Sequence, residues 1–272
     1  MSVTNVSKRR GTILDEIMAH HREQLPKTMR DVPLADLRAV VATAAPPRDF
    51  AAALRAPGVS LIAECKKASP SKGLLVRDYD PARLARTYER AGARAISVLT
   101  DARHFQGSLE DLRDVKEAVR VPVLRKDFIF DPYQVYEARA AGADAVLLIA
   151  AVLGDGDLGE LLALTHRLGM TALVEVHTET EVGRVLPMGP KVIGVNNRDL
   201  QTFEVDFGLA ARLRALIPAE IAVVGESGLR TPEDVKTMAA AGVDAVLVGE
   251  TLLRSKDVAG ATRALVLAGS PG

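Results

Sequence analysis

Short runs of apolar, β-branched residues alternate with segments of helical periodicity from about residue 60 onward. Eight runs are long enough to form strands, and their carboxyl ends lie 20 to 35 residues apart. That spacing accommodates one strand, one helix and two short loops. The pattern predicts an α/β fold, a (β/α)8 TIM barrel. The runs are residues 60–64, 95–99, 122–126, 145–150, 171–176, 192–196, 221–225 and 245–249.

An internal repeat supports the count of units. The segments AGARAISV, AGADAVLL and AGVDAVLV begin at residues 91, 141 and 241, each as a helix end, a glycine and the next strand. Their starts lie 50 and 100 residues apart, as two and four βα units require. The same Ala-Gly-Ala step is common in doubly wound sheets, so that open architecture remains the alternative to a closed barrel.

Residues 1–58 stand outside the repeat. Ile13, Leu14, Ile17 and Met18 have helical spacing, and an alanine- and proline-rich loop follows at 42–47. We therefore expect a helical extension over 1–58 and one catalytic barrel over 59–272, together a single structural domain. The extension could plug the bottom of the barrel, cover its mouth or dock on another chain.

Composition excludes several classes of protein. Lysine plus arginine equals aspartate plus glutamate at 35 each, so no excess charge favours nucleic acid or an anionic membrane. The one cysteine, Cys65, excludes an internal disulfide and a cysteine-rich metal site. The basic start is not followed by an apolar signal core, and the apolar run 145–153 is too short to span a bilayer. We expect a cytoplasmic monomer that binds a small phosphorylated substrate, and no nucleic acid or membrane.

Charged and amide side chains gather where the predicted strands end. In a TIM barrel, catalytic groups lie at the carboxyl ends of the strands. Glu64 and Lys66 lie two residues apart, so both face the barrel axis while Cys65 points into the helix layer. Such a pair could be a structural ion pair at the rim. Similar strand ends carry Lys126, Glu175 and Asn196, which favours a catalytic site because buried charges are costly without a function.

Two glycine-containing turns follow the last two strands, where barrels commonly bind phosphate. Glu226, Ser227 and Gly228 follow one strand, and Gly249 and Glu250 follow the next. Backbone N–H groups and a short helix at 250–254 could hold the dianion. The alternative is that each glycine only permits a tight turn.

The segment AECKKASPS at 63–71 resembles the signature of indole-3-glycerol-phosphate synthases. The resemblance extends over about residues 60–268. Its further motifs are SVLT at 97–100, FQGS at 105–108, LRKDFI at 124–129, LVEV at 173–176, GVNNRDL at 194–200, GESG at 225–228 and LVG at 247–249.

The resemblance implies a reaction and catalytic roles. The substrate would be 1-(2-carboxyphenylamino)-1-deoxyribulose 5-phosphate, converted to indole-3-glycerol phosphate, carbon dioxide and water in tryptophan biosynthesis. Lys126 or Lys66 would protonate or stabilise the ketone oxygen, with the choice between them open. Glu175 and Glu64 would serve the later proton transfers, and Asn196 would orient the reacting groups.

The resemblance also implies a binding pocket. Arg198 would contact the substrate carboxylate, and Glu226 and Ser227 the sugar hydroxyls. Ser69 would belong to a mobile loop at 69–73 that closes over the substrate. Phosphate would contact Lys66, Gly228, Gly249 and the backbone at Glu250. The walls around the aromatic ring would be Phe105, Phe128, Leu173, Leu200 and Leu247.

The histidines show no metal-ligand spacing, so we predict no metal and no cofactor, with His20, His21, His104, His166 and His177 solvated or structural. A class I aldolase with a Schiff base on Lys126 is the enzymatic alternative. A silent sugar-phosphate-binding barrel is the non-enzymatic one. A related isomerase or a tryptophan synthase α subunit would share the phosphate turns but not the motif at 63–71.

Overall fold

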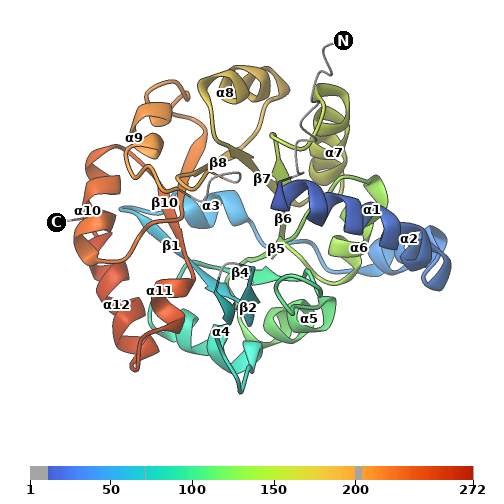
Figure 1. Cartoon of the computed structure of the whole chain (residues 1–272), viewed down its shortest axis with the longest axis horizontal. Helices are drawn as coiled ribbons and strands as arrows, with labels where there is room; N and C mark the ends of the chain where they lie inside the picture. Colours follow the sequence, from blue (N-terminus) through green and yellow to red (C-terminus); the bar gives the residue numbers. More distant parts are fainter. Residues whose placement is uncertain (1–11, 71, 200–203, 272) are drawn as a thin grey trace, which may run out of the picture.

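A closed barrel of eight parallel strands forms the centre of the computed structural model, which describes residues 12–70, 72–199 and 204–271 (Figure 1). β10 pairs with β1 to close the barrel. The predicted TIM barrel is confirmed, and every predicted strand end lies within one residue of the observed one. The strands are β1 (Ser60–Cys65), β4 (Ala95–Leu99), β5 (Val123–Lys126), β6 (Ala145–Ile149), β7 (Thr171–Val176), β8 (Val192–Asn196), β9 (Ala222–Glu226) and β10 (Ala245–Val248).

Helices surround the barrel, and many begin at a side chain that accepts a hydrogen bond from the first turn. Asp80, Ser108 and Thr231 cap α4, α5 and α10 in this way. The helices are α1 (Ile13–Asp31), α2 (Leu34–Thr43), α3 (Phe50–Leu54), α4 (Pro81–Arg90), α5 (Leu109–Ala118), α6 (Pro132–Ala140), α7 (Asp155–Arg167), α8 (Glu179–Val185), η1 (Leu186–Met188), α9 (Leu209–Arg214), α10 (Pro232–Ala240), α11 (Glu250–Leu253) and α12 (Val258–Ala268).

The loop predicted at 69–73 contains a feature that the sequence pattern did not reveal. β2 (Ala68–Ser69) pairs with β3 (Gly73–Leu74) in a small antiparallel hairpin. Its backbone is tied to the turn after β4, because Ala68 N–H donates to the carbonyl of Phe105 at 3.1 Å. Ser71 lies outside the described residues. The hairpin places Ser69 at the mouth of the barrel.

Alternation along β1 shows how the strands sort their side chains. Leu61, Ala63 and Cys65 pack in the layer between barrel and helices, and Ile62 packs inside the barrel. Glu64 follows the inward direction of Ile62, as the period of two requires. The predicted outward direction of Cys65 is confirmed.

The N-terminal extension contacts both ends of the barrel, which are two of the three positions considered from the sequence. Phe50 and Leu54 of α3 belong to the cluster inside the barrel, where Ala95, Ala145 and Ala222 leave room for large side chains. α1 lies at the opposite end, and its Ile13 and Ile17 line the cavity at the mouth. The extension therefore both fills the bottom of the barrel and forms part of the wall at the top.

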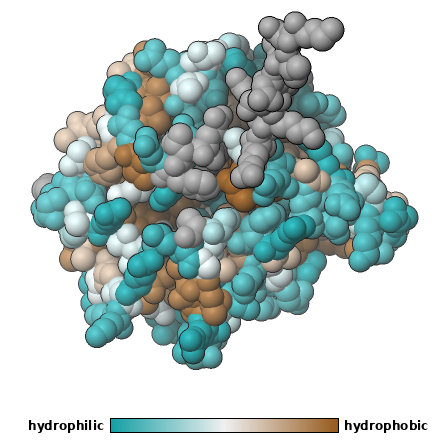
Figure 2. All heavy atoms as spheres, viewed as in Figure 1, coloured by the Kyte–Doolittle hydropathy of each residue, from teal (hydrophilic) through white to brown (hydrophobic). Residues whose placement is uncertain are grey.

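The face viewed in Figure 1 is mostly hydrophilic at its rim. Figure 2 shows apolar side chains between the hydrophilic ones towards the centre of this face. No helix in the described ranges is long and apolar enough to cross a membrane.

Candidate active site

A cavity of about 910 Å³ opens at the carboxyl ends of the barrel strands. The structure brings all the candidate residues for catalysis and binding named above to its walls, although they come from separate strands and loops. They are Glu64, Lys66, Ser69, Phe105, Lys126, Phe128, Glu175, Asn196, Arg198, Glu226, Ser227, Gly228, Gly249 and Glu250.

Lys126 lies among carboxylates at the end of β5. Its Nζ is 3.6 Å from Glu226 Oε2 and 3.7 Å from Glu175 Oε2. Burial alone would favour the neutral amine, but the charges of Glu226, Glu175 and Glu64 outweigh it and raise the pKa of Lys126 well above its usual range. The side chain is therefore a fixed ammonium, suited to stabilising negative charge and poorly suited to acting as a free amine.

A second lysine–glutamate pair lies at the end of β1. Lys66 Nζ donates to Glu64 Oε1 at 2.6 Å. Burial acts to raise the pKa of Glu64, but the charges of Lys66 and Lys126 and the hydrogen bond lower it overall. Glu64 is therefore held ionised. Glu64 and Lys66 therefore do form an ion pair at the rim, which the sequence analysis gave as a structural alternative, and both side chains line the cavity.

Glu175, at the end of β7, is oriented by the next strand. Asn196 Nδ2 donates to Glu175 Oε1 at 3.3 Å, and the backbone N–H of Arg198 donates to Asn196 Oδ1 at 3.1 Å. The second bond fixes which end of the amide faces Glu175. His177 Nε2 lies 3.6 Å from the same carboxylate oxygen.

Glu226 is buried deeper than a residue expected to contact a sugar. It is 2% exposed, and its Oε1 has no hydrogen-bond partner among the described residues. Burial raises the pKa of Glu226 to about 8, aided by the charges of Glu175 and Glu64 and opposed by Lys126. Three carboxylates thus share two ammonium groups, and Glu226 is the one that keeps its proton at neutral pH.

The turn after β9 contains two successive residues with left-handed backbone conformation. Ser227 and Gly228 both have positive φ, 63° and 82°. Successive N–H groups in turns of this kind can form a concave site for an anion. An added Cβ at Gly228 would collide with Val205, so glycine is required there for space as well as for conformation.

Gly249 ends β10 beside the β1 pair. An added Cβ would collide with the Glu64 carboxylate. We expect Gly249→Ala to lower kcat/KM by about 10²-fold because it would displace the carboxylate of Glu64, which the sequence predicts to be catalytic. Gly156→Ala is the matched control, since Gly156 in α7 has open space around it and should lose no activity. Steady-state kinetics of both variants test this; equal activities would separate Gly249 from the chemistry.

The apolar part of the cavity differs in detail from the prediction. Phe105, Phe128 and Leu247 line it, but Leu173 is fully buried in the barrel core beneath it. Leu200 lies outside the described residues. Leu173 does not reach the cavity because its inward-facing position lies one layer deeper in the barrel than Glu175, which lines the cavity.

Sequence reasoning missed several residues of the cavity wall. Ile13, Leu14 and Ile17 come from α1, and Arg230 follows the turn after β9. The helical spacing of the first three signalled a buried face, but not which surface would cover it. Arg230 could have been suspected from its place two residues after Gly228.

One histidine cluster also escaped the sequence analysis. His21, Asp101 and Asp127 place ligand-type atoms within 4.8 Å of one another. They come from α1 and from the ends of β4 and β5, so no short motif links them. His21 is thus neither solvated nor isolated.

Lysine–glutamate pairs at the mouth of a closed barrel are typical of a (β/α)8-barrel enzyme, because such enzymes carry their catalytic groups at the carboxyl ends of the strands. Solved structures agree on the fold. A thiamine phosphate pyrophosphorylase from Pyrococcus furiosus superposes with a TM-score of 0.59 at 17% identity, covering 77% of this chain and 95% of that one.

Sequence comparison is more specific. The family model described as indole-3-glycerol phosphate synthase matches residues 14–265. The chain is 52% identical over 260 residues to the indole-3-glycerol phosphate synthase of Mycobacterium ulcerans, with 96% of each chain covered. The synthase of a Roseiflexus species is 52% identical over 263 residues, covering 93% of this chain and 98% of that one. The chain belongs to the indole-3-glycerol phosphate synthase family, and it is a carboxy-lyase.

Proposed function

We propose that this enzyme converts 1-(2-carboxyphenylamino)-1-deoxyribulose 5-phosphate to indole-3-glycerol phosphate, carbon dioxide and water, as a step of tryptophan biosynthesis. The observation that carries the proposal is the convergence of two lysine–glutamate pairs in one cavity, Lys126 with Glu175 and Lys66 with Glu64. The reaction has two demanding steps, ring closure and dehydration, and each needs a cation and a base.

Ring closure is assigned to Lys126. The ring carbon that bears the carboxylate attacks the ketone carbon, and negative charge develops on the ketone oxygen. An ammonium group surrounded by carboxylates stabilises that oxygen and supplies its proton. Loss of carbon dioxide leaves its bonding electrons in the ring and restores aromaticity. Glu175, held by Asn196, would accept the amine N–H proton as the ring carbon attacks and return it to the nitrogen as carbon dioxide leaves.

Dehydration is assigned to the β1 pair. The leaving hydroxyl needs a proton, and the ring system must lose one to form the indole double bond. Lys66 and Glu64, 2.6 Å apart, can give and take these protons. Glu226, neutral at pH 7, can donate a hydrogen bond to a sugar hydroxyl.

Binding is assigned to the two sides of the cavity. The turn at Ser227 and Gly228, with the backbone at Gly249 and Glu250, would hold the phosphate. Phe105 and Phe128 would pack against the aromatic ring, because both line the cavity and their own ring centroids lie 6.4 Å apart. They follow β4 and β5, which lie across the barrel from β9. Arg198 would meet the carboxylate, for which a guanidinium is suited.

A direct assay tests the function. Incubating the purified chain with the carboxyphenylamino-deoxyribulose phosphate should produce indole fluorescence without added metal or cofactor. A class I aldolase would instead need a neutral lysine amine, which the raised pKa of Lys126 disfavours. Borohydride trapping of a ketose phosphate on Lys126, with no indole formed, would overturn the proposal in favour of the aldolase.

The proton on Glu226 predicts how stability depends on pH. The unfolded chain releases this proton near the ordinary pKa of 4.5, whereas the folded protein keeps it until about 8. The folded state therefore binds more protons between these values, and the free energy of unfolding falls as pH rises through that window. Glu226→Gln removes the effect.

Urea denaturation at about pH 5.5 and about pH 8 checks this prediction. The free energy of unfolding of Glu226→Gln, relative to that of wild type, should increase by roughly 1 to 3 kcal/mol from the lower to the higher pH. Glu233→Gln on exposed α10, whose side chain is 74% exposed, serves as the matched control and should track wild type. An identical offset at both pH values would mean that Glu226 is ionised throughout.

A further inference from the structure

His21 lies on the stripe of α1 that faces the cavity. Ile13, Ile17 and His21 are spaced four residues apart, so they share one face of the helix. The two isoleucines line the cavity. A contact that fixes His21 therefore also fixes the rotation and depth at which these isoleucines meet a bound molecule.

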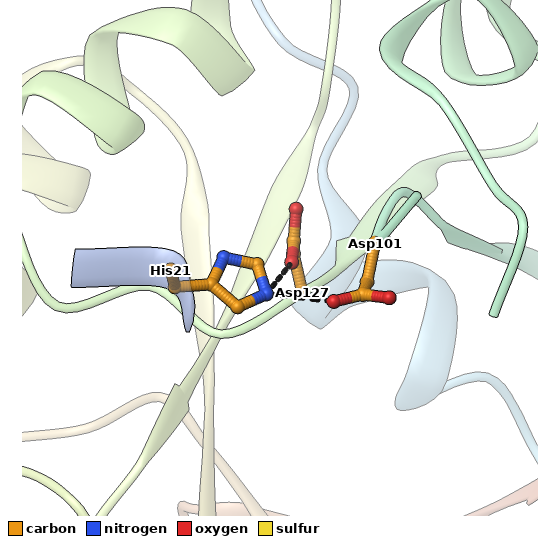
Figure 3. A group of neighbouring side chains, drawn as sticks. All are labelled: His21, Asp101 and Asp127. Carbon is orange, nitrogen blue, oxygen red and sulfur yellow. Dashed lines mark hydrogen bonds and ion pairs between the residues drawn. The ribbon is translucent and has the colours of Figure 1, made fainter. Parts of the chain in front are cut away.

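Two buried carboxylates hold His21 in place. Its Nε2 is 2.7 Å from Asp101 Oδ2 and 3.8 Å from Asp127 Oδ1 (Figure 3). Its ring also packs on Phe128, with centroids 5.5 Å apart. The imidazole side chain is 16% exposed, while those of Asp101 and Asp127 are 1% and 3% exposed. The contact is thus a largely dry ion pair, beside one wall of the cavity.

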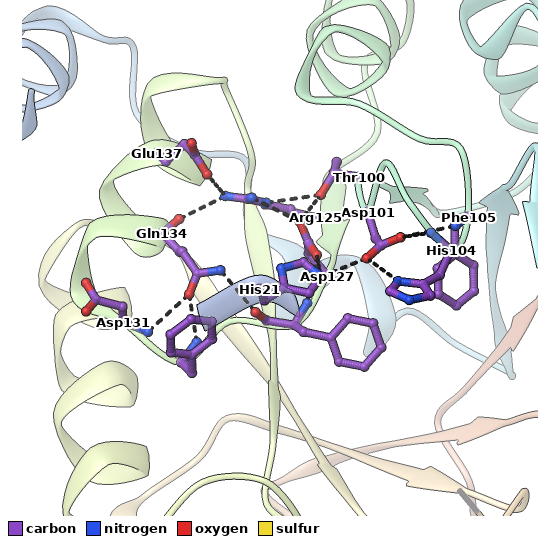
Figure 4. Close-up of polar contacts among 12 residues, drawn as sticks. His21, Thr100, Asp101, His104, Phe105, Arg125, Asp127, Asp131, Gln134 and Glu137 are labelled. Carbon is purple, nitrogen blue, oxygen red and sulfur yellow. Dashed lines mark hydrogen bonds and ion pairs between the residues drawn. The ribbon is translucent and has the colours of Figure 1, made fainter. Parts of the chain in front are cut away.

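Asp101 extends this contact to the turn after β4. Its Oδ1 accepts from the backbone N–H groups of His104 at 2.5 Å and Phe105 at 3.1 Å (Figure 4). Phe105 is one of the two aromatic side chains of the cavity. One carboxylate therefore fixes both α1 and the loop that presents Phe105.

Asp127 extends the contact to the end of β5. Its Oδ2 accepts from Thr100 Oγ1 at 2.5 Å and from Arg125 at 3.0 Å, and its Oδ1 accepts from the backbone N–H of Phe128 at 2.9 Å. Asp127 directly follows Lys126 in the chain. The network around His21 thus reaches the backbone on which the central lysine stands.

A cation site is a less fitting interpretation of the same residues. Every carboxylate oxygen of Asp101 and Asp127 already accepts a hydrogen bond from the protein. The Arg125 guanidinium also lies against Asp127 and supplies positive charge where an ion would be needed. The geometry matches hydrogen-bonded ion pairing.

We propose that His21 is a positioning residue for the reaction. Its ion pair with Asp101 and Asp127 holds three segments together: α1, the turn that carries Phe105, and the end of β5. These segments form the wall of the cavity that packs against the aromatic part of the substrate. The proposal rests on the proposed function for the identity of that substrate. The clamping of α1 itself rests only on the contacts described.

The charge of His21 should control the strength of this clamp. The charged and titratable groups around it are Asp101, Asp127 and Arg125 on the barrel side, His104 and Arg103 in the turn, and His20 on its own helix. Burial lowers the pKa of His21, but the bond to Asp101 and the charges of both aspartates outweigh burial and raise it overall. The clamp is therefore strongest with His21 protonated and weakens as pH rises through that raised pKa.

Steady-state kinetics of His21→Gln and His20→Gln test the proposal. Glutamine keeps a polar side chain but no charge. His20 is the adjacent control, and its ring nitrogen contacts Arg103 instead of a carboxylate. We expect His21→Gln to raise KM about tenfold at pH 6 with kcat within about twofold, because wall closure acts on binding. His20→Gln should leave both unchanged.

The pH profile separates positioning from a general structural role. Titration of the substrate phosphate is common to both proteins, so it cancels in the ratio of their KM values. The KM of His21→Gln divided by the KM of wild type should fall several-fold between about pH 6 and pH 9, because wild type loses the charge on His21 over this range. His21→Lys, which stays charged, should restore much of the low-pH KM and flatten the profile. A ratio independent of pH, or an unchanged KM, would overturn the proposal.

Amide hydrogen exchange supplies a readout that needs no substrate. At pH 6, exchange in α1 should be about tenfold faster in His21→Gln than in wild type or His20→Gln, as expected for a locally less stable helix. If the chain failed to form indole, the proposed function would be wrong, but the exchange rates would still test whether His21 stabilises α1. Unchanged exchange in α1 would refute the clamp whatever the enzyme's substrate.

Discussion

Replacing Lys126 with methionine should lower kcat by about 10⁴-fold, the largest effect we expect from any single substitution. Methionine fills a similar volume but offers no charge and no proton. The ketone oxygen would then develop negative charge without a cation at the end of β5. Lys66 cannot replace it, because its ammonium is paired with Glu64 at 2.6 Å.

The measurement is single-turnover formation of indole fluorescence at saturating substrate. Lys236→Met is the matched control, since its side chain on α10 is 63% exposed and its loss should leave kcat unchanged. Removing Lys126 also leaves Glu175 and Glu226 without their shared cation, so circular dichroism should accompany the assay. A folded Lys126→Met protein with near wild-type turnover would remove Lys126 from the mechanism.

Glu175→Gln should reduce kcat by about 10³-fold while KM changes little. Glutamine preserves the shape of the side chain and can still hydrogen-bond Asn196, but it cannot take up a proton. Its loss also withdraws one of the charges that raise the pKa of Lys126. The variant therefore tests the charge and proton acceptance of Glu175 while the shape of the cavity is preserved.

Glu179→Gln is the matched control for this experiment. Glu179 lies at the start of α8, close in sequence but exposed to solvent. Its kinetics should equal those of wild type. A Glu175→Gln enzyme whose defect appears only in KM would assign Glu175 to binding and leave the base to be sought elsewhere, with Glu64 as the first candidate.

The barrel was predictable from sequence because its signals are local. Each barrel strand is a short apolar run, and many helices begin at a capping residue such as Ser108 or Thr231. The period of two also predicted the opposite directions of Glu64 and Cys65. The β2–β3 hairpin was missed because strands of two residues leave no periodic pattern.

The site was predictable in its members but not in its electrostatics. Strand ends identified Lys126, Glu175 and Glu226, since parallel strands deliver their carboxyl ends to one rim. The raised pKa of Glu226 depends on burial and on distances to three other charges, none of which follows from spacing.

By itself, the sequence determined the number and order of the βα units, the side chains that face the axis and the family. These follow from local periodicity and from short motifs. Only the tertiary structure decided where residues 12–58 lie, that α1 completes the cavity wall, and that His21 meets Asp101 and Asp127. Such contacts join residues 80 or more positions apart, and their geometry is set by packing of the whole barrel, which no local pattern encodes.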